Sequence, residues 1–171
     1  MRNTLPFNRS VLFCSVLLLS LLFATAPVNA AWYCAQGTIA VVQTPGATDS
    51  LVYYGWGPEF DLKSSRATWV HIAIPGPANA TKGAQNITIN VYTGSVDAWF
   101  SDVHVYNGRY RIYTTTGSWS DGHKTISVDL GSVRKFDKGL SISLLVKAGV
   151  EMMSHEVQIN GACANFVNIP K

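Results

Sequence analysis

The chain has 171 residues, 47% of them hydrophobic, and 13 Lys and Arg against 10 Asp and Glu give a formal net charge of +3. This length suits one domain. The composition excludes a membrane protein, a coiled coil, a disordered chain and a disulfide-dense miniprotein.

Residues 1–30 have the three parts of a secretory signal peptide. Arg2 and Arg9 form a basic head, the segment 11–26 carries no charge, and small residues precede a cleavage point after Ala30. The apolar run is too short to span a bilayer, so we expect no membrane span. The signal predicts a secreted or periplasmic protein whose mature domain is 31–171.

Removal of the signal peptide takes away two arginines and no acidic residue, which lowers the formal net charge from +3 to +1. A domain this close to neutrality has no basic surplus for a phosphate backbone. We therefore expect no nucleic-acid partner.

The mature domain retains two of the three cysteines, because Cys14 lies in the signal peptide. An even count in an exported protein predicts one disulfide, here between Cys34 and Cys163. Such a bond would join the first strand to the last. Two unpaired buried thiols are the alternative.

The mature domain consists of short runs in which apolar and polar residues alternate, separated by Gly, Pro, Asn, Asp and Ser. This pattern is typical of antiparallel sheets with one buried face. We predict a single antiparallel β-sandwich, jelly-roll or Ig-like, of about eight to ten strands and with no helix longer than two turns. In chain order, the strands are expected near 32–42, 51–55, 69–74, 86–91, 103–106, 109–115, 125–130, 140–147 and 156–160.

Asn107-Gly108 is the sharpest turn signal, because this pair suits the two positive φ angles of a type I′ hairpin. A loop at these two residues predicts that His104 pairs with Arg111 and Asp102 with Tyr113. Alternation then turns the two valines of the first strand, together with Tyr110 and Ile112 of the second, toward the core.

The same register places polar and aromatic side chains together on the outer face of the hairpin. One interpretation is a recognition surface on which tyrosines stack on sugar rings and charged groups bind hydroxyls or a carboxylate. The other is an ordinary solvated hairpin face. A further aromatic, in the expected polar loop 114–122, is the tryptophan we expect to be most exposed. The candidate ligand-binding residues are Asp102, His104, Tyr106, Arg109, Arg111, Tyr113 and Trp119.

No sequence motif carries catalytic or metal-binding chemistry. The mature histidines lack zinc-site spacing, and no nucleophile elbow, calcium loop or phosphate-binding glycine loop occurs. We predict no catalytic residue, metal or cofactor, and we interpret the isolated histidines as surface or satisfied core residues. Asn79 and Asn86 begin glycosylation sequons, which matter only in a glycosylating host.

Four short motifs, in order, resemble a family of small bacterial β-sandwich proteins. They are Gly55-Trp56-Gly57, the segment from Trp69 to Pro75, Val103-His104-Val105-Tyr106-Asn107-Gly108 and Gly139-Leu140-Ser141-Ile142-Ser143. The family pattern runs Gly-Trp-Gly, Trp-Phe-His-Ile-Pro-Ile-Pro and Val-His-Ile-Trp-Asp-Gly, so Ala73 stands where the family has its first proline. Tyr106-Asn107 likewise replaces Trp-Asp. The resemblance covers about 55–167 and implies a sandwich fold and a bacterial source. The family has no assigned activity, so no catalytic residue is transferred.

These observations favour an exported, non-catalytic binding or adhesion module, with glycans or a cell-surface component as candidate ligands. The first alternative is a structural or assembly subunit that acts by strand or edge pairing. The second alternative is a small secreted hydrolase. Exposed aromatic side chains would favour the binding module, and a long unpaired edge strand would favour the assembly subunit. A pocket of clustered carboxylates would favour the hydrolase.

Overall fold

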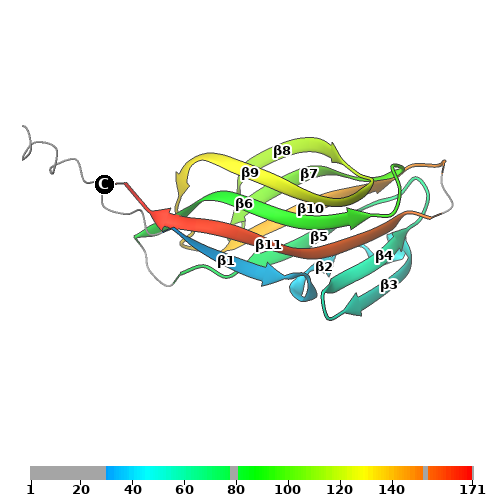
Figure 1. Cartoon of the computed structure of the whole chain (residues 1–171), viewed down its shortest axis with the longest axis horizontal. Coiled ribbons are helices and arrows are strands. Elements are labelled where there is room, and N and C mark those ends of the chain that lie inside the picture. Colours follow the sequence, from blue (N-terminus) through cyan, green and yellow to red (C-terminus); the bar gives the residue numbers. More distant parts are fainter. Residues whose placement is uncertain (1–29, 78–80, 152–153, 171) are drawn as a thin grey trace, which may run out of the picture.

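Two antiparallel sheets lie face to face in the computed structural model, which describes residues 30–77, 81–151 and 154–170 (Figure 1). Two short 3₁₀ helices, η1 (Gly37–Ile39) and η2 (Pro45–Ala47), lie between the early strands. The first sheet has the order β3 (Thr48–Tyr54), β4 (Gly57–Leu62), β11 (Glu156–Asn168), β6 (Lys82–Thr93) and β9 (Gly122–Arg134), with β1 (Ala31–Gln36) also paired to β11. The second sheet has the order β2 (Val41–Val42), β5 (Ala67–Ile74), β10 (Leu140–Ala148), β7 (Ala98–Asn107) and β8 (Tyr110–Trp119).

The strand order is that of a jelly roll. Strand β4 pairs with β11, β5 with β10, β6 with β9 and β7 with β8, so the eight strands behave as one long antiparallel hairpin. This hairpin is rolled up, because β11 also pairs with β6 and β10 with β7. The β-sandwich prediction is confirmed, and of its two named forms the chain adopts the jelly roll.

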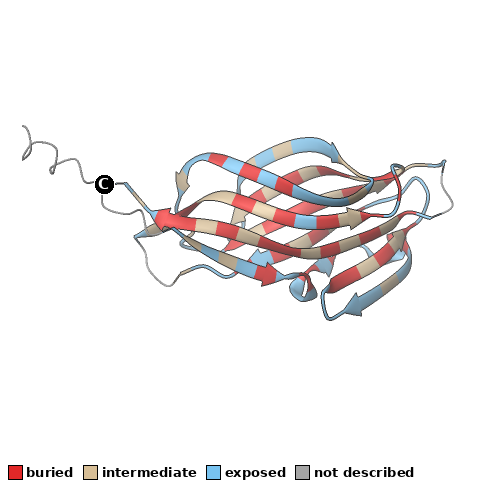
Figure 2. Ribbon diagram, in the orientation of Figure 1, coloured by how far each residue is buried: buried red, intermediate tan, exposed pale blue. Residues whose placement is uncertain are grey.

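The core lies between the two sheets and is built from the apolar members of the alternating runs. Val70, Ile72 and Ile74 of β5 are buried, as are the corresponding residues of β6, β9, β10 and β11 (Figure 2). Figure 2 also shows that the edge strands β3 and β8 are mostly exposed. Leu145 breaks the alternation and lies on the outer face of the second sheet beside its partner Asp102.

The predicted disulfide is present and joins the first strand to the last. Cys34 of β1 and Cys163 of β11 are direct cross-strand partners, 129 positions apart in sequence. Closing a loop of this length stabilises the fold by about 4–5 kcal/mol, through the reduced entropy of the unfolded chain. The bond holds β1 against the edge of β11 that β4 leaves unpaired.

Two glycines, one after β1 and one at the start of β4, let the backbone lie close against this edge of β11. A Cβ atom on either Gly37 or Gly57 would lie 2.0 Å from the carbonyl oxygen of Ile159, so neither position accepts a side chain. Gly57 also has a φ of 149°, which side chains rarely adopt. The Gly55-Trp56-Gly57 motif therefore reflects close backbone packing at Gly57.

The predicted register of the β7–β8 hairpin is wrong by one residue at the turn. Asn107 pairs with Tyr110, so the loop is Gly108-Arg109. The Asn107 side chain holds this residue in the strand: its Nδ2 donates to Asp137 at 2.8 Å, and its Oδ1 accepts from the Lys138 amide at 2.9 Å. The hydrogen bond from Asn107 also lowers the pKa of Asp137. These bonds to a distant loop override the local turn preference.

A β-bulge at Ile112 follows the turn and changes which side chains share a face. Val105 therefore pairs with Tyr113 rather than with Tyr110. Tyr113 packs against the core, whereas Tyr110 and Ile112, which we expected inside, are exposed. The segment expected as a polar loop continues β8 as far as Trp119, which pairs with Phe100 and packs against the core.

Among the described residues, no helix is long or apolar enough to cross a bilayer. The predicted signal peptide, apart from Ala30, and the sequon at Asn79 lie outside the described residues. Asn86 lies on β6, where it pairs with Asp129 and Asn165.

The disulfide predicts a specific loss of stability. Replacing both cysteines, as Cys34→Ser with Cys163→Ser, should lower the free energy of unfolding by about 2–5 kcal/mol in urea titrations, because the unfolded chain gains freedom. In the wild-type exported protein, thiol labelling under denaturing, non-reducing conditions should find no free cysteine. Stoichiometric labelling of both residues would rule out the bond.

Candidate functional site

The outer face of the second sheet brings together polar side chains from segments far apart in sequence. The apolar alternates of β5, β10 and β7 point into the core, so their polar neighbours point outward. Cross-strand pairing aligns them in rows. The central row runs across all five strands of the sheet as Val41, His71, Ser143, His104 and Thr114.

A β-bulge in β7 directs the candidate residues outward. Ala98 and Phe100 are buried before the bulge, and Val103 and Val105 are buried after it, so the inward positions shift by one residue. The pairing of β7 with β10 shows this shift: Leu145 opposes residue 102 and Val146 opposes Phe100. The extra residue therefore places the side chains of His104 and Tyr106 on the outer face.

Three aromatic rings form a cluster on this face. The Trp69 and His104 rings lie 4.6 Å apart between centroids with an interplanar angle of 36°, and the His104 and Tyr106 rings lie 6.2 Å apart. The Tyr106 hydroxyl is 3.4 Å from His104 Nδ1. All three side chains are half-buried, so the cluster offers ring surface while remaining held by its neighbours.

A hydrogen-bonded group of polar side chains lies beside the rings. His71 Nδ1 is 2.7 Å from the Ser143 hydroxyl, and His71 Nε2 is 3.3 Å from Gln43 Oε1. Because the amide oxygen only accepts, Nε2 carries the proton and Nδ1 accepts from Ser143. This arrangement fixes the imidazole ring and leaves the Gln43 amide nitrogen to donate to a ligand.

This part of the outer face contains two shallow hollows. The first, of about 280 Å³, is lined by Gln43, Trp69, His71, His104, Tyr106, Arg111 and Ser143. The second, of about 310 Å³, adds Gly108, Arg109 and Ser141 and shares His71, Tyr106 and Ser143. The shared residues make the two hollows one continuous surface, which we call the sheet hollow.

The histidines of the sheet hollow are shifted toward the neutral form. Burial lowers the pKa of His71. Burial also lowers the pKa of His104, the Arg111 guanidinium lowers it further, and the Asp102 carboxylate opposes them. Asp102 itself accepts a hydrogen bond from the Ser101 hydroxyl and lies 3.8 Å from Lys147 Nζ.

The structure brings some of the predicted residues together and separates others. Asp102, His104, Tyr106 and Arg111 share the outer face, and Arg109 lies in the turn beside them. Tyr113 and Trp119 point to the opposite side of the same strand and pack against the core. Their role in ligand binding stays a prediction, and their placement gives them no access to the sheet hollow.

Six residues of the sheet hollow were not among the predicted ligand-binding residues: Gln43, Trp69, His71, Gly108, Ser141 and Ser143. Alternation alone indicated that Trp69 and His71 share the polar face of β5. The missing information was that β10 lies between β5 and β7, which is a long-range pairing that no local pattern carries.

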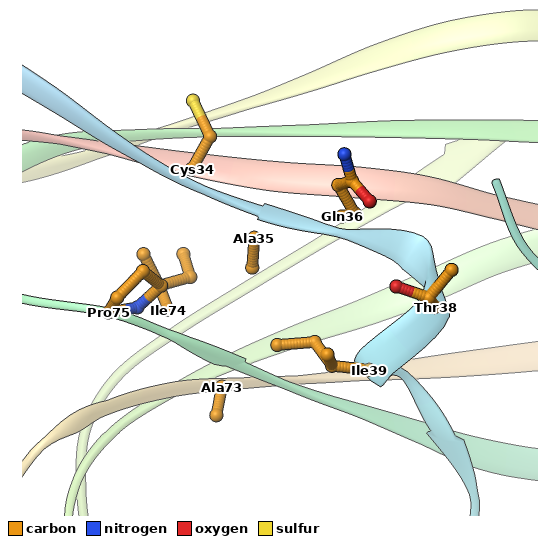
Figure 3. Close-up of a pocket in the computed structure, with 8 residues that line it drawn as sticks. All are labelled: Cys34, Ala35, Gln36, Thr38, Ile39, Ala73, Ile74 and Pro75. Atoms are coloured by element: carbon orange, nitrogen blue, oxygen red, sulfur yellow. The ribbon is translucent and has the colours of Figure 1, made fainter. Parts of the chain in front are cut away.

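Other features of the surface fit a ligand less well. Trp56 and Tyr54 are exposed, but their rings stack on each other at 4.6 Å with an interplanar angle of 7°, which covers one face of each. A hollow of about 500 Å³ between β1 and β5 is lined mainly by apolar atoms, including those of Ile39 and Ile74 (Figure 3). Figure 3 shows Cys34 pointing away from it.

The fourth region with chemistry-bearing groups is a buried histidine at one end of the sandwich. His155 is 1% exposed, and its two ring nitrogens lie 3.0 Å from Asp97 Oδ2 and 3.2 Å from the Leu62 carbonyl. It is a satisfied core residue. In the described parts of the chain, no three His, Cys, Asp or Glu residues are grouped as metal ligands would be.

Comparisons with known proteins identify neither a family nor a function. No protein-family model and no curated protein matches the chain, which agrees with the resemblance to a family without an assigned activity. Among solved structures, a cyclase from Fischerella sp. TAU is similar at 9% identity and a TM-score of 0.48, over 82% of this chain and 90% of that chain. A family 35 carbohydrate binding module from Clostridium thermocellum is similar at 8% identity and a TM-score of 0.47. This match covers 78% of this chain and 97% of that chain.

A third similar structure is a family two carbohydrate esterase from Cellvibrio japonicus, at 9% identity and a TM-score of 0.43. The match covers 83% of this chain but only 36% of that chain. All three TM-scores lie below 0.5, so these likenesses leave the function to be argued from the sheet hollow itself.

The charges around His104 predict how its pKa responds to substitution. Arg111→Gln should raise the pKa of His104 toward its ordinary value of 6.5, because a repelling positive charge is removed. Asp102→Asn should lower it further, because an attracting negative charge is lost. NMR titration of the His104 ring protons measures both shifts. Arg66→Gln, an exposed arginine at the β4–β5 connection, is the control and should change nothing. An unchanged pKa in Arg111→Gln would contradict the described geometry.

Proposed function

We propose that this protein is a non-catalytic carbohydrate-binding module that binds its ligand in the sheet hollow. The observation that carries the proposal is the ring cluster of Trp69, His104 and Tyr106 beside the hydrogen-bonding groups of Gln43 and Ser143. A sugar has apolar ring faces that stack on aromatic rings and hydroxyls that need hydrogen-bond partners. The sheet hollow offers both kinds of contact on one surface.

The groups in the sheet hollow favour binding over glycoside hydrolysis. Glycosidases use a pair of carboxyl groups on either side of the scissile bond. Among the residues that the structure describes, no carboxylate lines either part of the sheet hollow. The small-hydrolase alternative predicted clustered carboxylates in a pocket, and no observation on this face favours it.

An extracellular or periplasmic location is compatible with the disulfide, because such bonds persist in oxidising compartments. The uncharged segment 11–26 after two arginines supports export by a signal peptide. A module exported in this way meets polysaccharides of the cell surface or the surroundings. Export and glycan binding therefore form one consistent proposal.

The ring cluster predicts which substitutions weaken glycan binding. Trp69→Ala and Tyr106→Ala should each weaken binding of a glycan found on an array by about 1–3 kcal/mol, by analogy with base stacking on aromatic side chains. Isothermal titration calorimetry with the mature protein measures the loss.

Trp32→Ala is the matched control, because Trp32 is 52% exposed but lies on β1 of the other sheet. It should bind like the wild type. If Trp69→Ala and Tyr106→Ala bind the glycan as tightly as the wild type does, the ligand binds elsewhere. If the array and polysaccharide pull-downs find no glycan, the proposed function is wrong.

A second candidate function is assembly through the edge strand β3, which pairs only with β4 among the described strands. Val52 and Tyr53 are 46% and 52% exposed, and Asp49 is the charged residue of the strand. Exposed apolar edge strands are templates for pairing with another chain, and charges or prolines usually protect them. A second copy of this chain is the partner we test.

Edge pairing through β3 predicts concentration-dependent self-association in sedimentation velocity experiments. Val52→Lys should abolish it, because a lysine on the edge opposes strand addition. Ser127→Lys on β9, the opposite edge of the same sheet, is the control and should leave association unchanged. A wild-type protein that stays monomeric at high concentration would rule out this second function.

A further inference from the structure

Each part of the sheet hollow is lined by an arginine. Arg111 lines the part that contains Trp69 and His104, and Arg109 lines the part that contains Ser141. Within the described chain, Arg111 makes no hydrogen bond or ion pair, and its resolved interaction is electrostatic repulsion of protonated His104. An arginine that faces a hollow without an acidic partner is available to an anionic ligand.

The carboxylate on this face that acts on His104, Asp102, already has other partners. Asp102 accepts from the Ser101 hydroxyl at 2.5 Å and lies 3.8 Å from Lys147 Nζ. It pairs with Thr116 on β8, whereas Arg111 pairs with Tyr106. Asp102 therefore offsets the charge of Lys147 and leaves that of Arg111 in place.

Further positive charge lies at the turn end of the sheet hollow. Arg109 Cζ and Lys138 Nζ lie 5.0 Å and 4.6 Å from the centre of the Tyr110 ring, and Arg109 donates a hydrogen bond to the Tyr110 hydroxyl at 2.9 Å. Tyr110 thus holds both cations near the β7–β8 turn. Asp137, on the β9–β10 connection, accepts from Asn107, and the charges of Lys138 and Lys135 lower its pKa further, so it offsets part of the lysine charge and none of that of Arg109.

We propose that the ligand of the sheet hollow is an acidic polysaccharide, whose carboxylate or sulfate groups bind Arg111 and Arg109 while its sugar rings stack on the aromatic cluster. This inference rests on the proposed glycan-binding function and names its substrate class. The guanidinium group presents parallel N–H donors that match the paired oxygens of such anions. Because Arg111 lies beside the ring cluster, one sugar unit can contact both.

An anionic ligand also makes binding depend on pH. The groups facing His104 are Trp69 of β5, Ser143 of β10, Asp102 and Tyr106 of β7, and Arg111 of β8. His71 faces Gln43 and Ser143. Burial lowers the pKa of both histidines, and a bound anion favours their protonated forms. Ligand binding therefore takes up protons, and affinity rises as the pH falls through the pKa values of these two side chains.

The test compares acidic and neutral forms of the same sugar chain. We would titrate the mature protein with a galacturonic acid hexasaccharide and with its carboxyl-reduced, neutral form, and with dextran sulfate against dextran. The acidic member of at least one pair should bind about tenfold more tightly than its neutral partner, and added salt should reduce that difference. The pair that responds identifies carboxylate or sulfate as the anion.

Arg111→Gln should weaken binding of the acidic ligand about tenfold and should reduce the preference for the acidic over the neutral form of the same sugar chain. Arg66→Gln, next to the end of β5 that lies opposite to the β7–β8 turn, is the matched control and should bind like the wild type. The His104 titration shows that the variant is folded. Arg111→Lys keeps the charge and should retain part of the affinity.

Equal affinity for acidic and neutral members of both pairs would overturn the acidic ligand. So would an Arg111→Gln variant that binds the acidic chain like the wild type. If a neutral glycan binds and Trp69→Ala abolishes that binding, the glycan-binding function stands while the acidic substrate class fails. If an array ligand binds and neither acidic probe does, the inference is likewise wrong.

Discussion

Strand β10 lies between β5 and β7, and this pairing places the residues of the sheet hollow side by side. Ser143 has His71 on one side and His104 on the other, although the three residues come from segments far apart in the chain. A two-strand hairpin alone would offer Tyr106 and Arg111 without Trp69 or Gln43. The hollow therefore exists only when the jelly roll has closed.

The local parts of this fold could be predicted from the sequence, since they depend on alternation. The buried positions of β5, β6, β9, β10 and β11 follow directly from runs such as Ile87, Ile89 and Val91. The disulfide followed from cysteine count and compartment. In the candidate site, Asp102, His104, Tyr106 and Arg111 were predicted to share a face, and they do.

The rest depended on contacts between distant segments. Asn107 was interpreted as a turn residue, but its side chain binds the β9–β10 connection and keeps it in the strand. Two bulges, near Ser101 and Ile112, then shift the faces of β7 and β8 relative to simple alternation. Tyr113 was expected on the outer face and Trp119 in an exposed loop, whereas both pack against the core, because such shifts leave no clear mark in the sequence.

The bulge near Ser101 separates two properties of this surface that respond differently to mutation. The extra residue between Phe100 and Val103 sets which side chains of β7 enter the core, because regular alternation of the same residues would exchange core and surface over half the strand. Substitutions at 102, 104 or 106 leave that phase unchanged, because none of these side chains fills the core. A lineage can therefore change the chemistry of the face one residue at a time, while the length of the strand stays constant. A change of ligand preference at these positions therefore requires no change of fold.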